Sequence, residues 1–356
     1  MKLLFVARRF PPDVRSGTET VFERLLAEAR AAGHDVHLVA GFRRDRALLP
    51  AGTTAVDLRG RGATAWAAMP LAAMTAARRL RPDAVLSNSI EVRVPGVPTV
   101  TLVHDLNFGG DGEGAGARGR RLFYRVQAAG LARIVAVSEV TRQALLAIGV
   151  APDKVVTIHN GVDLSRFVPS PRPPDSEVRL VHVSRVLSGK GQHCSLDALG
   201  RMRPDQRRGI SLAIVGTVAD ATYADQLRVQ AWNLPVQLHF DVQDVVPHYQ
   251  SADIALFPTR MPEGFGYAAV EAMACGLPVV GFEDPAVAEA TGGLAVLVPR
   301  DDIPAFRNAI LRLATDPAER RRLGEAGRMF VQRYRWADTW RAYERVLEGA
   351  AGLLGR

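Results

Sequence analysis

The order of elements in this chain can be read outward from residues 261–278, MPEGFGYAAVEAMACGLP. The preceding run, 253–257, is apolar and of strand length, and Pro258 ends it. Residues 267–274 are rich in Ala, Met and Glu, which favour a helix, and Gly276 supplies its stop. Strand, loop and helix in this order predict an α/β fold in which the loop leads into a helix entrance.

Two glycines, Gly264 and Gly266, lie at that entrance, where unpaired backbone N–H groups and the positive end of the helix dipole favour an anion. Glu263 and Glu271 bracket it. Carboxylates repel a lone anion but accept strong hydrogen bonds from hydroxyl groups. The stretch therefore suggests a diphosphate that carries a sugar on each side, a nucleotide sugar. The alternative is two surface glutamates beside an ordinary turn.

A dinucleotide site is a second alternative, because Gly264, Gly266 and Ala269 match a Gly-rich fingerprint. The match is weak, since residues 258–262 separate strand from glycine and the motif falls late in the chain. The βαβ unit at the N-terminus, residues 2–40, also lacks the tight G-x-G-x-x-G loop. Both observations argue against an NAD-binding site.

The composition is that of a globular protein with room for two domains: 356 residues, 47% hydrophobic and 23% charged. No stretch reaches membrane-span length and no signal peptide is evident, which predicts a cytoplasmic protein. The two cysteines, Cys194 and Cys275, have no metal-ligand spacing, and no D-x-D cluster could clamp a metal on a diphosphate. We therefore expect no metal and no cofactor beyond the substrate.

The net charge of +8 could indicate nucleic acid, an anionic membrane or a polyanionic substrate. Because the arginines are spread along the chain and no zinc finger or ribonucleoprotein motif accompanies them, nucleic acid is not expected. The segment 118–133 is basic and partly amphipathic, so it could touch anionic lipid, although a solvated basic face explains it as well. The preceding Gly-rich run, 108–119, suggests a connector or a loop that orders over an acceptor.

Other candidate site residues follow predicted strands. His104 ends the strand 98–103, at the edge where open α/β sheets bind ligands. After the proline-rich linker 169–176, a second domain should begin with the strand 178–183, followed by a loop that holds Arg185 and Lys190. The order of residues in this loop does not match the P-loop motif. Two cations at the end of a strand are nevertheless suited to binding a diphosphate.

The stretch 261–278 closely resembles the E-x7-E signature of retaining glycosyltransferases of family four, which have the GT-B fold of two Rossmann-like domains. The resemblance extends over essentially the whole chain. It implies that Glu263 contacts the donor sugar, that Glu271 holds the ribose, and that Arg185 and Lys190 balance the charge of the departing diphosphate. It further implies donor contacts for Gly17, Gly216 and the backbone of Gly264, Phe265, Gly266 and Tyr267, and a place for His104 near the donor sugar and acceptor.

We therefore expect an α/β protein with an N-terminal acceptor-binding domain at 1–168, a donor-binding domain at 177–335 and a C-terminal helix, 336–356, that returns to the first domain. The reaction would be transfer of a hexose-type sugar with retention, in the cleft between the domains, from a UDP-, GDP-, ADP- or dTDP-sugar. The acceptor would be a sugar, a lipid-linked molecule or a natural product, and the protein could lie at the inner membrane face.

The sequence alone leaves four other functions open. A phosphorylase or a nucleotide-sugar epimerase could use the same architecture. A non-catalytic polyanion or nucleic-acid binder would explain the charge. A degenerate transferase could serve as a partner subunit, although the presence of Glu263, Glu271, Arg185 and Lys190 argues against it.

Overall fold

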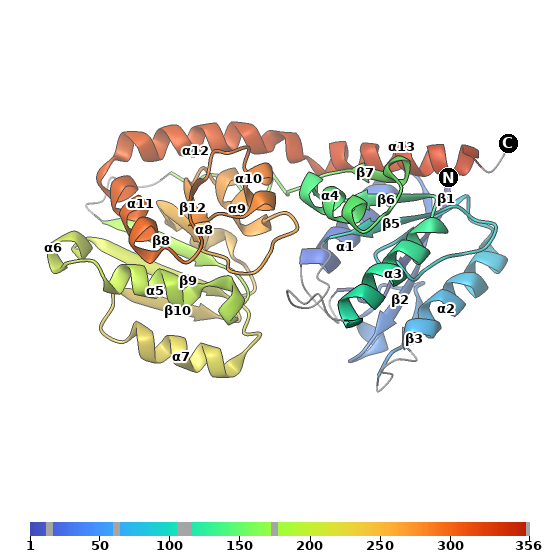
Figure 1. The fold of residues 1–356 in the computed structure, drawn as a ribbon, viewed down its shortest axis with the longest axis horizontal. Helices are drawn as coiled ribbons and strands as arrows, with labels where there is room; N and C mark the ends of the chain where they lie inside the picture. The colour runs from blue at the N-terminus through green and yellow to red at the C-terminus, as the bar shows by residue number, and fades with distance from the viewer. Residues whose placement is uncertain (12–16, 60–64, 105–114, 172–176, 354–356) are drawn as a thin grey trace. The chain divides into compact units, whose positions relative to one another are not determined.

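The protein is described by a computed structural model that covers residues 1–11, 17–59, 65–104, 115–171 and 177–353. The chain divides into two compact units (Figure 1). The first comprises Met1–Gly161 and Trp336–Arg356, and the second comprises Val162–Arg335. Each is built on a parallel sheet covered by helices, the arrangement expected when buried apolar strands alternate with helices.

The described residues of the first unit form a seven-stranded sheet in the order β3-β2-β1-β4-β5-β6-β7. The interior strand β1 is fully buried from Leu3 to Ala7, as a two-sided hydrophobic strand requires. The elements are β1 (Lys2–Ala7), α1 (Gly17–Ala31), β2 (Asp35–Phe42), β3 (Thr54–Asp57), α2 (Ala65–Leu80), β4 (Ala84–Ser87), β5 (Thr99–Val103), α3 (Ala115–Ala129), β6 (Arg133–Ala136), α4 (Glu139–Ala147), β7 (Val155–Thr157) and α13 (Trp336–Leu353), with short 3₁₀ turns at Arg46–Leu48 and Pro152–Lys154.

The second unit has a six-stranded sheet among its described residues, in the order β10-β9-β8-β11-β12-β13. Its elements are β8 (Val178–Val183), α5 (Gln192–Gly200), α6 (Pro204–Arg207), β9 (Ile210–Gly216), α7 (Ala221–Ala231), β10 (Val236–Phe240), α8 (Val246–Ser251), β11 (Ile254–Phe257), α9 (Tyr267–Ala274), β12 (Val279–Phe282), α10 (Pro285–Ala290), β13 (Val296–Val298), α11 (Ile303–Thr315) and α12 (Pro317–Val331), with 3₁₀ turns at Ser188–Lys190 and Gln332–Tyr334. Buried residues on both faces of the sheet make up its core.

The division between the units falls at Gly161, earlier than the expected domain end at 168. The reason is local pairing: Val162 N donates to Tyr334 O at 2.7 Å, and Phe167 packs with Tyr249, so this segment belongs to the second unit's core. Helix α13 then packs on α1, β4 and β5 of the first unit (Figure 1), which confirms the predicted return of the C-terminal helix.

Candidate active site

The strand order of the second sheet reverses between β8 and β11, which are neighbours although far apart in sequence. Open α/β sheets bind ligands outside the carboxyl ends of the strands at such a reversal. The loop 184–191 leaves β8 there, and the loop 258–266 leaves β11 beside it. The predicted cationic loop and the predicted Glu263 loop are therefore adjacent.

Backbone contacts join these two loops. Gly189 O accepts from Arg260 N at 2.8 Å and from Met261 N at 3.2 Å. Gly191 has φ +75°, and a Cβ atom at this position would lie 1.9 Å from Pro258 O. Only glycine permits both the left-handed conformation and this approach. The close packing brings the end of the Lys190 loop against the exit of β11.

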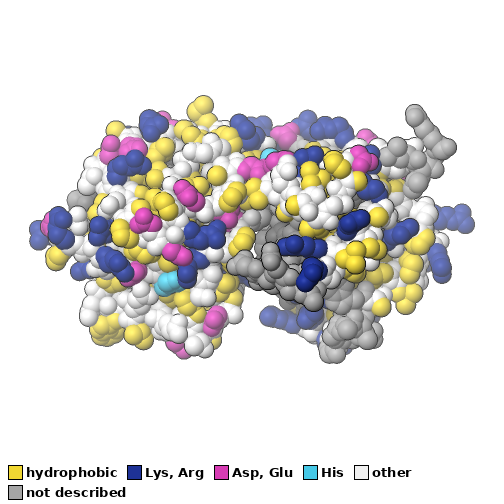
Figure 2. Space-filling model, viewed as in Figure 1, with side chains coloured by type: hydrophobic (Ala, Val, Ile, Leu, Met, Phe, Trp, Pro, Cys, Tyr) yellow, Lys and Arg dark blue, Asp and Glu magenta, His cyan; other side chains and the backbone are white. Residues whose placement is uncertain are grey.

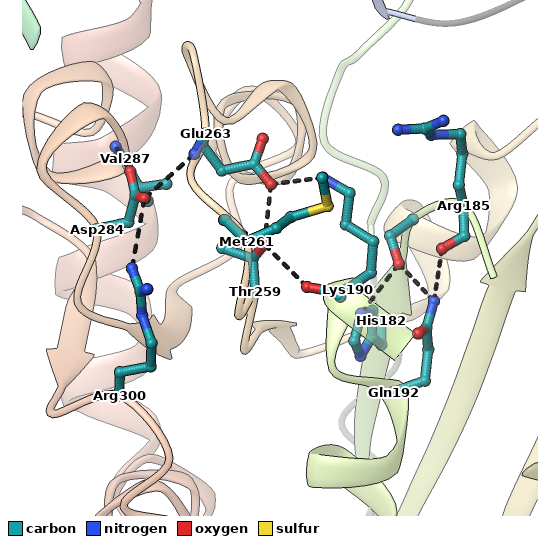
Figure 3. A network of polar contacts seen from close by, with 12 residues as sticks. His182, Arg185, Lys190, Gln192, Thr259, Met261, Glu263, Asp284, Val287 and Arg300 are labelled. Atoms are coloured by element: carbon teal, nitrogen blue, oxygen red, sulfur yellow. Dashed lines mark hydrogen bonds and ion pairs between the residues drawn. The ribbon is translucent and has the colours of Figure 1, made fainter. Parts of the chain in front are cut away.

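The result is an ion pair between Lys190 and Glu263 (Figure 3). Lys190 Nζ lies 2.5 Å from Glu263 Oε1, and each side chain is 13% exposed. The buried Thr259 donates to the same oxygen at 3.0 Å. Because both contacts are on Oε1, the carboxylate is fixed in orientation while Oε2 has no partner among the described residues.

Asp284 fixes the backbone of the same loop. Its Oδ2 accepts from Glu263 N at 3.2 Å, and its Oδ1 accepts from Ala286 N and Val287 N at 3.0 and 3.1 Å, which caps α10 (Figure 3). Asp284 is 4% exposed, and Arg300 lies 3.9 Å from its carboxylate. The buried carboxylate of Asp284 thus holds both the start of α10 and the backbone of Glu263.

Helix α9 begins as predicted, at Tyr267, with Gly266 as the N-cap in a left-handed conformation at φ +83°. No side chain in the described part of the chain caps this end, so the first amides of the helix are available to an anion. The buried Phe265 packs against Tyr267 and Tyr334, each at 5.3 Å between ring centroids. That packing holds the loop at the helix entrance.

Glu271 lies on the second turn of α9. Tyr249 on α8 donates its hydroxyl to Ala268 O at 3.1 Å and contacts Glu271 Oε2 at 3.4 Å. Burial raises the pKa of Glu271 to about 7, against the opposing effects of Arg166 and the Tyr249 hydroxyl. The carboxyl group is therefore poised between a neutral and a charged form near neutral pH.

Arg185 follows the end of β8 and is exposed, and its guanidinium has no hydrogen bond or ion pair to the residues that the structure describes.

Gly216 ends the neighbouring β9, where a Cβ atom would lie 1.7 Å from Ser184 O, so only glycine fits. Asp241 follows β10 at φ +58° and accepts from Val218 N at 3.0 Å. Its short carboxylate thus stabilises the left-handed backbone at this position.

Two predicted site residues lie in the first unit. Gly17 is the first residue of α1, which follows β1, and His104 follows β5. Burial lowers the pKa of His104 to about 3, and its Nε2 is buried without a partner among the described residues. The imidazole is therefore neutral at neutral pH. Ser16, Asp105 and the Gly-rich run 108–114 lie outside the described residues.

Sequence reasoning missed Thr259 and Asp284, which hold Glu263 from two sides. Thr259 follows the predicted strand end and could have been suspected from that position alone. Nothing in the sequence signals that Asp284 reaches Glu263 N, because 21 residues separate them.

The fold and this edge of the second sheet define a class: a protein of two Rossmann-like units, one of which brings Lys190, Glu263 and the start of helix α9 together at the strand-order reversal. Comparison with known proteins identifies the family within this class. The chain matches two family profiles, "Glycosyltransferase Family 4" over residues 15–166 and "Glycosyl transferases group 1" over residues 177–316. The chain belongs to this family, glycosyltransferase family four.

Curated relatives agree with this assignment. A D-inositol 3-phosphate glycosyltransferase 1 from Catenulispora acidiphila is 30% identical over 74% of this chain and 70% of its own length. A GDP-mannose-dependent phosphatidylinositol dimannoside mannosyltransferase from Mycobacterium tuberculosis is 29% identical over 90% of both chains. For other relatives, such as the D-inositol 3-phosphate glycosyltransferase of Thermobifida fusca, the chain spans only about half of their length.

Solved structures show the same fold. Anabaena HepE in complex with UDP-glucose superposes with a TM-score of 0.78 at 18% identity, covering 98% of this chain and 100% of that one. Sucrose-phosphate synthase from Thermosynechococcus elongatus gives 0.80 at 18% identity, covering 99% and 100%. The likeness over both units establishes the GT-B fold that the sequence predicted.

Proposed function

We propose that this protein is a retaining glycosyltransferase that moves a hexose-type sugar from a nucleotide diphosphate to an acceptor hydroxyl. The observation that carries the proposal is the Lys190–Glu263 pair at the strand-order reversal, with the exposed Arg185 on the same loop as the lysine. Two cations and an uncapped helix entrance suit a diphosphate, and a carboxylate held by its neighbours suits sugar hydroxyls.

The second unit would bind the donor and the first unit the acceptor. Arg185, Lys190 and the entrance of α9 would hold the diphosphate, and Glu263 would accept hydrogen bonds from sugar hydroxyls through its free oxygen. Glu271 would hold the ribose, as its position one turn further along α9 suggests. Supporting donor or acceptor contacts would come from Gly17, His104, Gly216, Gly264, Phe265, Gly266 and Tyr267.

The chemistry follows from these roles. The acceptor oxygen attacks the anomeric carbon on the face from which the diphosphate departs, the bond between that carbon and the phosphate oxygen breaks, and a leaving phosphate oxygen takes the acceptor's proton. Negative charge grows on the diphosphate, where Lys190 and Arg185 stabilise it. Glu263 positions the sugar and forms no covalent bond.

The donor class is a nucleotide-diphosphate sugar. HepE binds UDP-glucose, and the M. tuberculosis relative is GDP-mannose dependent and acts on a phosphatidylinositol dimannoside. We propose a lipid-linked acceptor here, because α3 presents an exposed face that mixes arginine with large apolar side chains. Among the described residues, no helix is both long and apolar enough to cross a bilayer.

Activity of a Lys190→Met variant tests the proposal. UDP-, GDP-, ADP- and dTDP-sugars are first screened by thermal shift, and hydrolysis of the stabilising donor is then measured with EDTA present. We expect kcat to fall by about a hundredfold in the variant, because one preorganised charge at the leaving group is lost. The control is Arg260→Gln, which removes an exposed cation of the adjoining loop paired with Asp301 and should change kcat less than about twofold.

Wild-type turnover in Lys190→Met would contradict the site assignment. A product with inverted anomeric configuration by NMR, or a trapped glycosyl adduct on Glu263, would contradict the mechanism while leaving the donor site intact.

A further inference from the structure

Next to Arg185 and Lys190, four polar side chains, three of them buried, form a continuous chain of hydrogen bonds, and Figure 3 shows the part around His182 and Gln192. His182 Nδ1 lies 2.9 Å from Ser195 Oγ, and His182 Nε2 lies 3.1 Å from Ser184 Oγ. Gln192 Nε2 lies 2.8 Å both from Ser184 Oγ and from Arg185 O. His182 and Ser195 are 1% exposed and Gln192 is not exposed at all.

Arg185 O can only accept, so Gln192 must present its NH₂ group to it, and the same group donates to Ser184 Oγ. Ser184 Oγ keeps a proton of its own, and we assign this proton to the hydrogen bond with His182 Nε2. In this assignment the imidazole proton is on Nδ1 and is donated to Ser195. Burial lowers the pKa of His182 to about 3, helped by the nearby Lys190, which agrees with a neutral ring.

This chain connects the two ends of the cationic loop. Gln192 is the first residue of α5, whereas Arg185 is the second residue after β8. The amide fixes the backbone of Arg185, and the guanidinium of the same residue stays exposed toward solvent. In Figure 3 that guanidinium points away from Gln192. A fixed carbonyl sets the direction in which the arginine leaves the backbone.

We propose that Gln192 is a positioning residue for Arg185, and that Ser184 and His182 hold its amide in the required orientation. This inference rests on the proposed function, in which Arg185 stabilises the departing diphosphate. Gln192 would touch neither substrate nor the reacting atoms. A positioning error of about 1 Å at a charged group lowers a rate strongly, so a small shift of this carbonyl should be visible in kcat.

The other explanation is that the network only fills the core. Under that explanation, substitution lowers stability and leaves the contribution of Arg185 to catalysis unchanged. A double-mutant cycle separates the two, because residues that act together are not additive.

The cycle uses Gln192→Leu, Arg185→Ala and the double variant, with kcat at saturating donor and the Tm measured for each. We expect Gln192→Leu to lower kcat by about tenfold in the wild-type background, and by less than about twofold once Arg185 is absent. An equal loss in both backgrounds would overturn the inference. If Arg185→Ala itself kept full activity, the proposed role of Arg185 would fail first, so the two failures are distinguishable.

Ser184→Ala and Ser195→Ala provide a matched pair that avoids changing Gln192. Each removes one hydroxyl partner of His182, but only Ser184 contacts Gln192. We expect Ser184→Ala to lower kcat by about threefold or more, and Ser195→Ala to leave it unchanged within about twofold. Equal losses in the two variants would show a purely structural network. A nitrogen NMR spectrum with the proton of His182 on Nε2 would contradict the hydrogen-bond directions.

Discussion

Glu271 carries the clearest residue-scale consequence, because burial raises its pKa to about 7. Under the proposed function it accepts hydrogen bonds from ribose hydroxyls, and a carboxylate accepts more strongly than a neutral acid. As pH falls through about 7 the group becomes protonated, so donor binding should weaken on the acid side. Stability takes the opposite sign, because a raised carboxyl pKa favours the folded protein at lower pH.

We therefore expect donor affinity to be about tenfold lower at about pH 6 than at about pH 8, as expected for one group with a pKa near 7. Isothermal titration calorimetry with the nucleoside diphosphate measures this. Glu271→Gln is the control: its affinity should be lower than that of the wild type at high pH and should not vary with pH. A wild-type affinity that is flat between these pH values would contradict the role of Glu271.

Arg185, Lys190 and Glu263, which the sequence named, lie where the strand order of the second sheet reverses, but their partners were not predictable. Lys190 and Glu263 are 73 residues apart, and their ion pair depends on β8 and β11 being neighbours and on the approach of Gly191 to Pro258 O. The pattern of residue types indicates a ligand. The contact itself depends on tertiary packing, which a local pattern does not encode.

At the scale of elements, local signals predicted strands and helices well where they were strong. Helix α9 has the predicted bounds, because good helix formers lie between a glycine entrance and a glycine stop. The network of His182 and Gln192 was not predicted, because polar side chains inside a strand and a helix normally indicate a solvated face. The domain division at Gly161 also differs, since Phe167 packs into the second core.

Helix α3 presents an exposed face with two large apolar side chains, Leu122 and Val126, each 60% exposed. Their spacing of four residues places them on one side of the helix together with Arg118, Arg121 and Arg125. Elsewhere on the face shown in Figure 2, Lys and Arg side chains are interspersed with acidic and hydrophobic ones. A basic helix with an apolar stripe suits the surface of an anionic bilayer.

We expect the protein to float with vesicles that contain phosphatidylglycerol and to remain unbound with neutral phosphatidylcholine vesicles. Because apolar burial and charge attraction both contribute, Leu122→Ser combined with Val126→Ser should reduce the bound fraction by about tenfold. Leu71→Ser is the control, since Leu71 is 63% exposed on α2 and has no basic residue three or four positions away on either side. Equal binding to both kinds of vesicle would remove the membrane proposal.

On the scale of the whole molecule, the chain ends in the unit where it began. Helix α13 completes the first unit: Trp340 is 3% exposed, stacks on Phe5 at 6.5 Å and meets His34 at 5.5 Å between ring centroids. His34 also pairs with Glu344 at 2.7 Å. The last helix therefore stabilises the first unit, while the main donor residues proposed here, Arg185, Lys190 and Glu263, lie in the second.

This arrangement predicts that the two units can be destabilised separately. Trp340→Ala leaves a cavity beside Phe5 and should lower the free energy of unfolding of the first unit by about 3–5 kcal/mol. Hydrogen-exchange mass spectrometry should then show faster exchange in β1, β4 and β5 and unchanged exchange in β8 and β11. Trp232→Ala is the control, because Trp232 is 79% exposed and should affect neither unit.

Since Arg185, Lys190 and Glu263 all belong to the second unit, the affinity of Trp340→Ala for the nucleoside diphosphate should stay within about twofold of wild type. A large loss of that affinity would show that donor binding depends on the first unit as well.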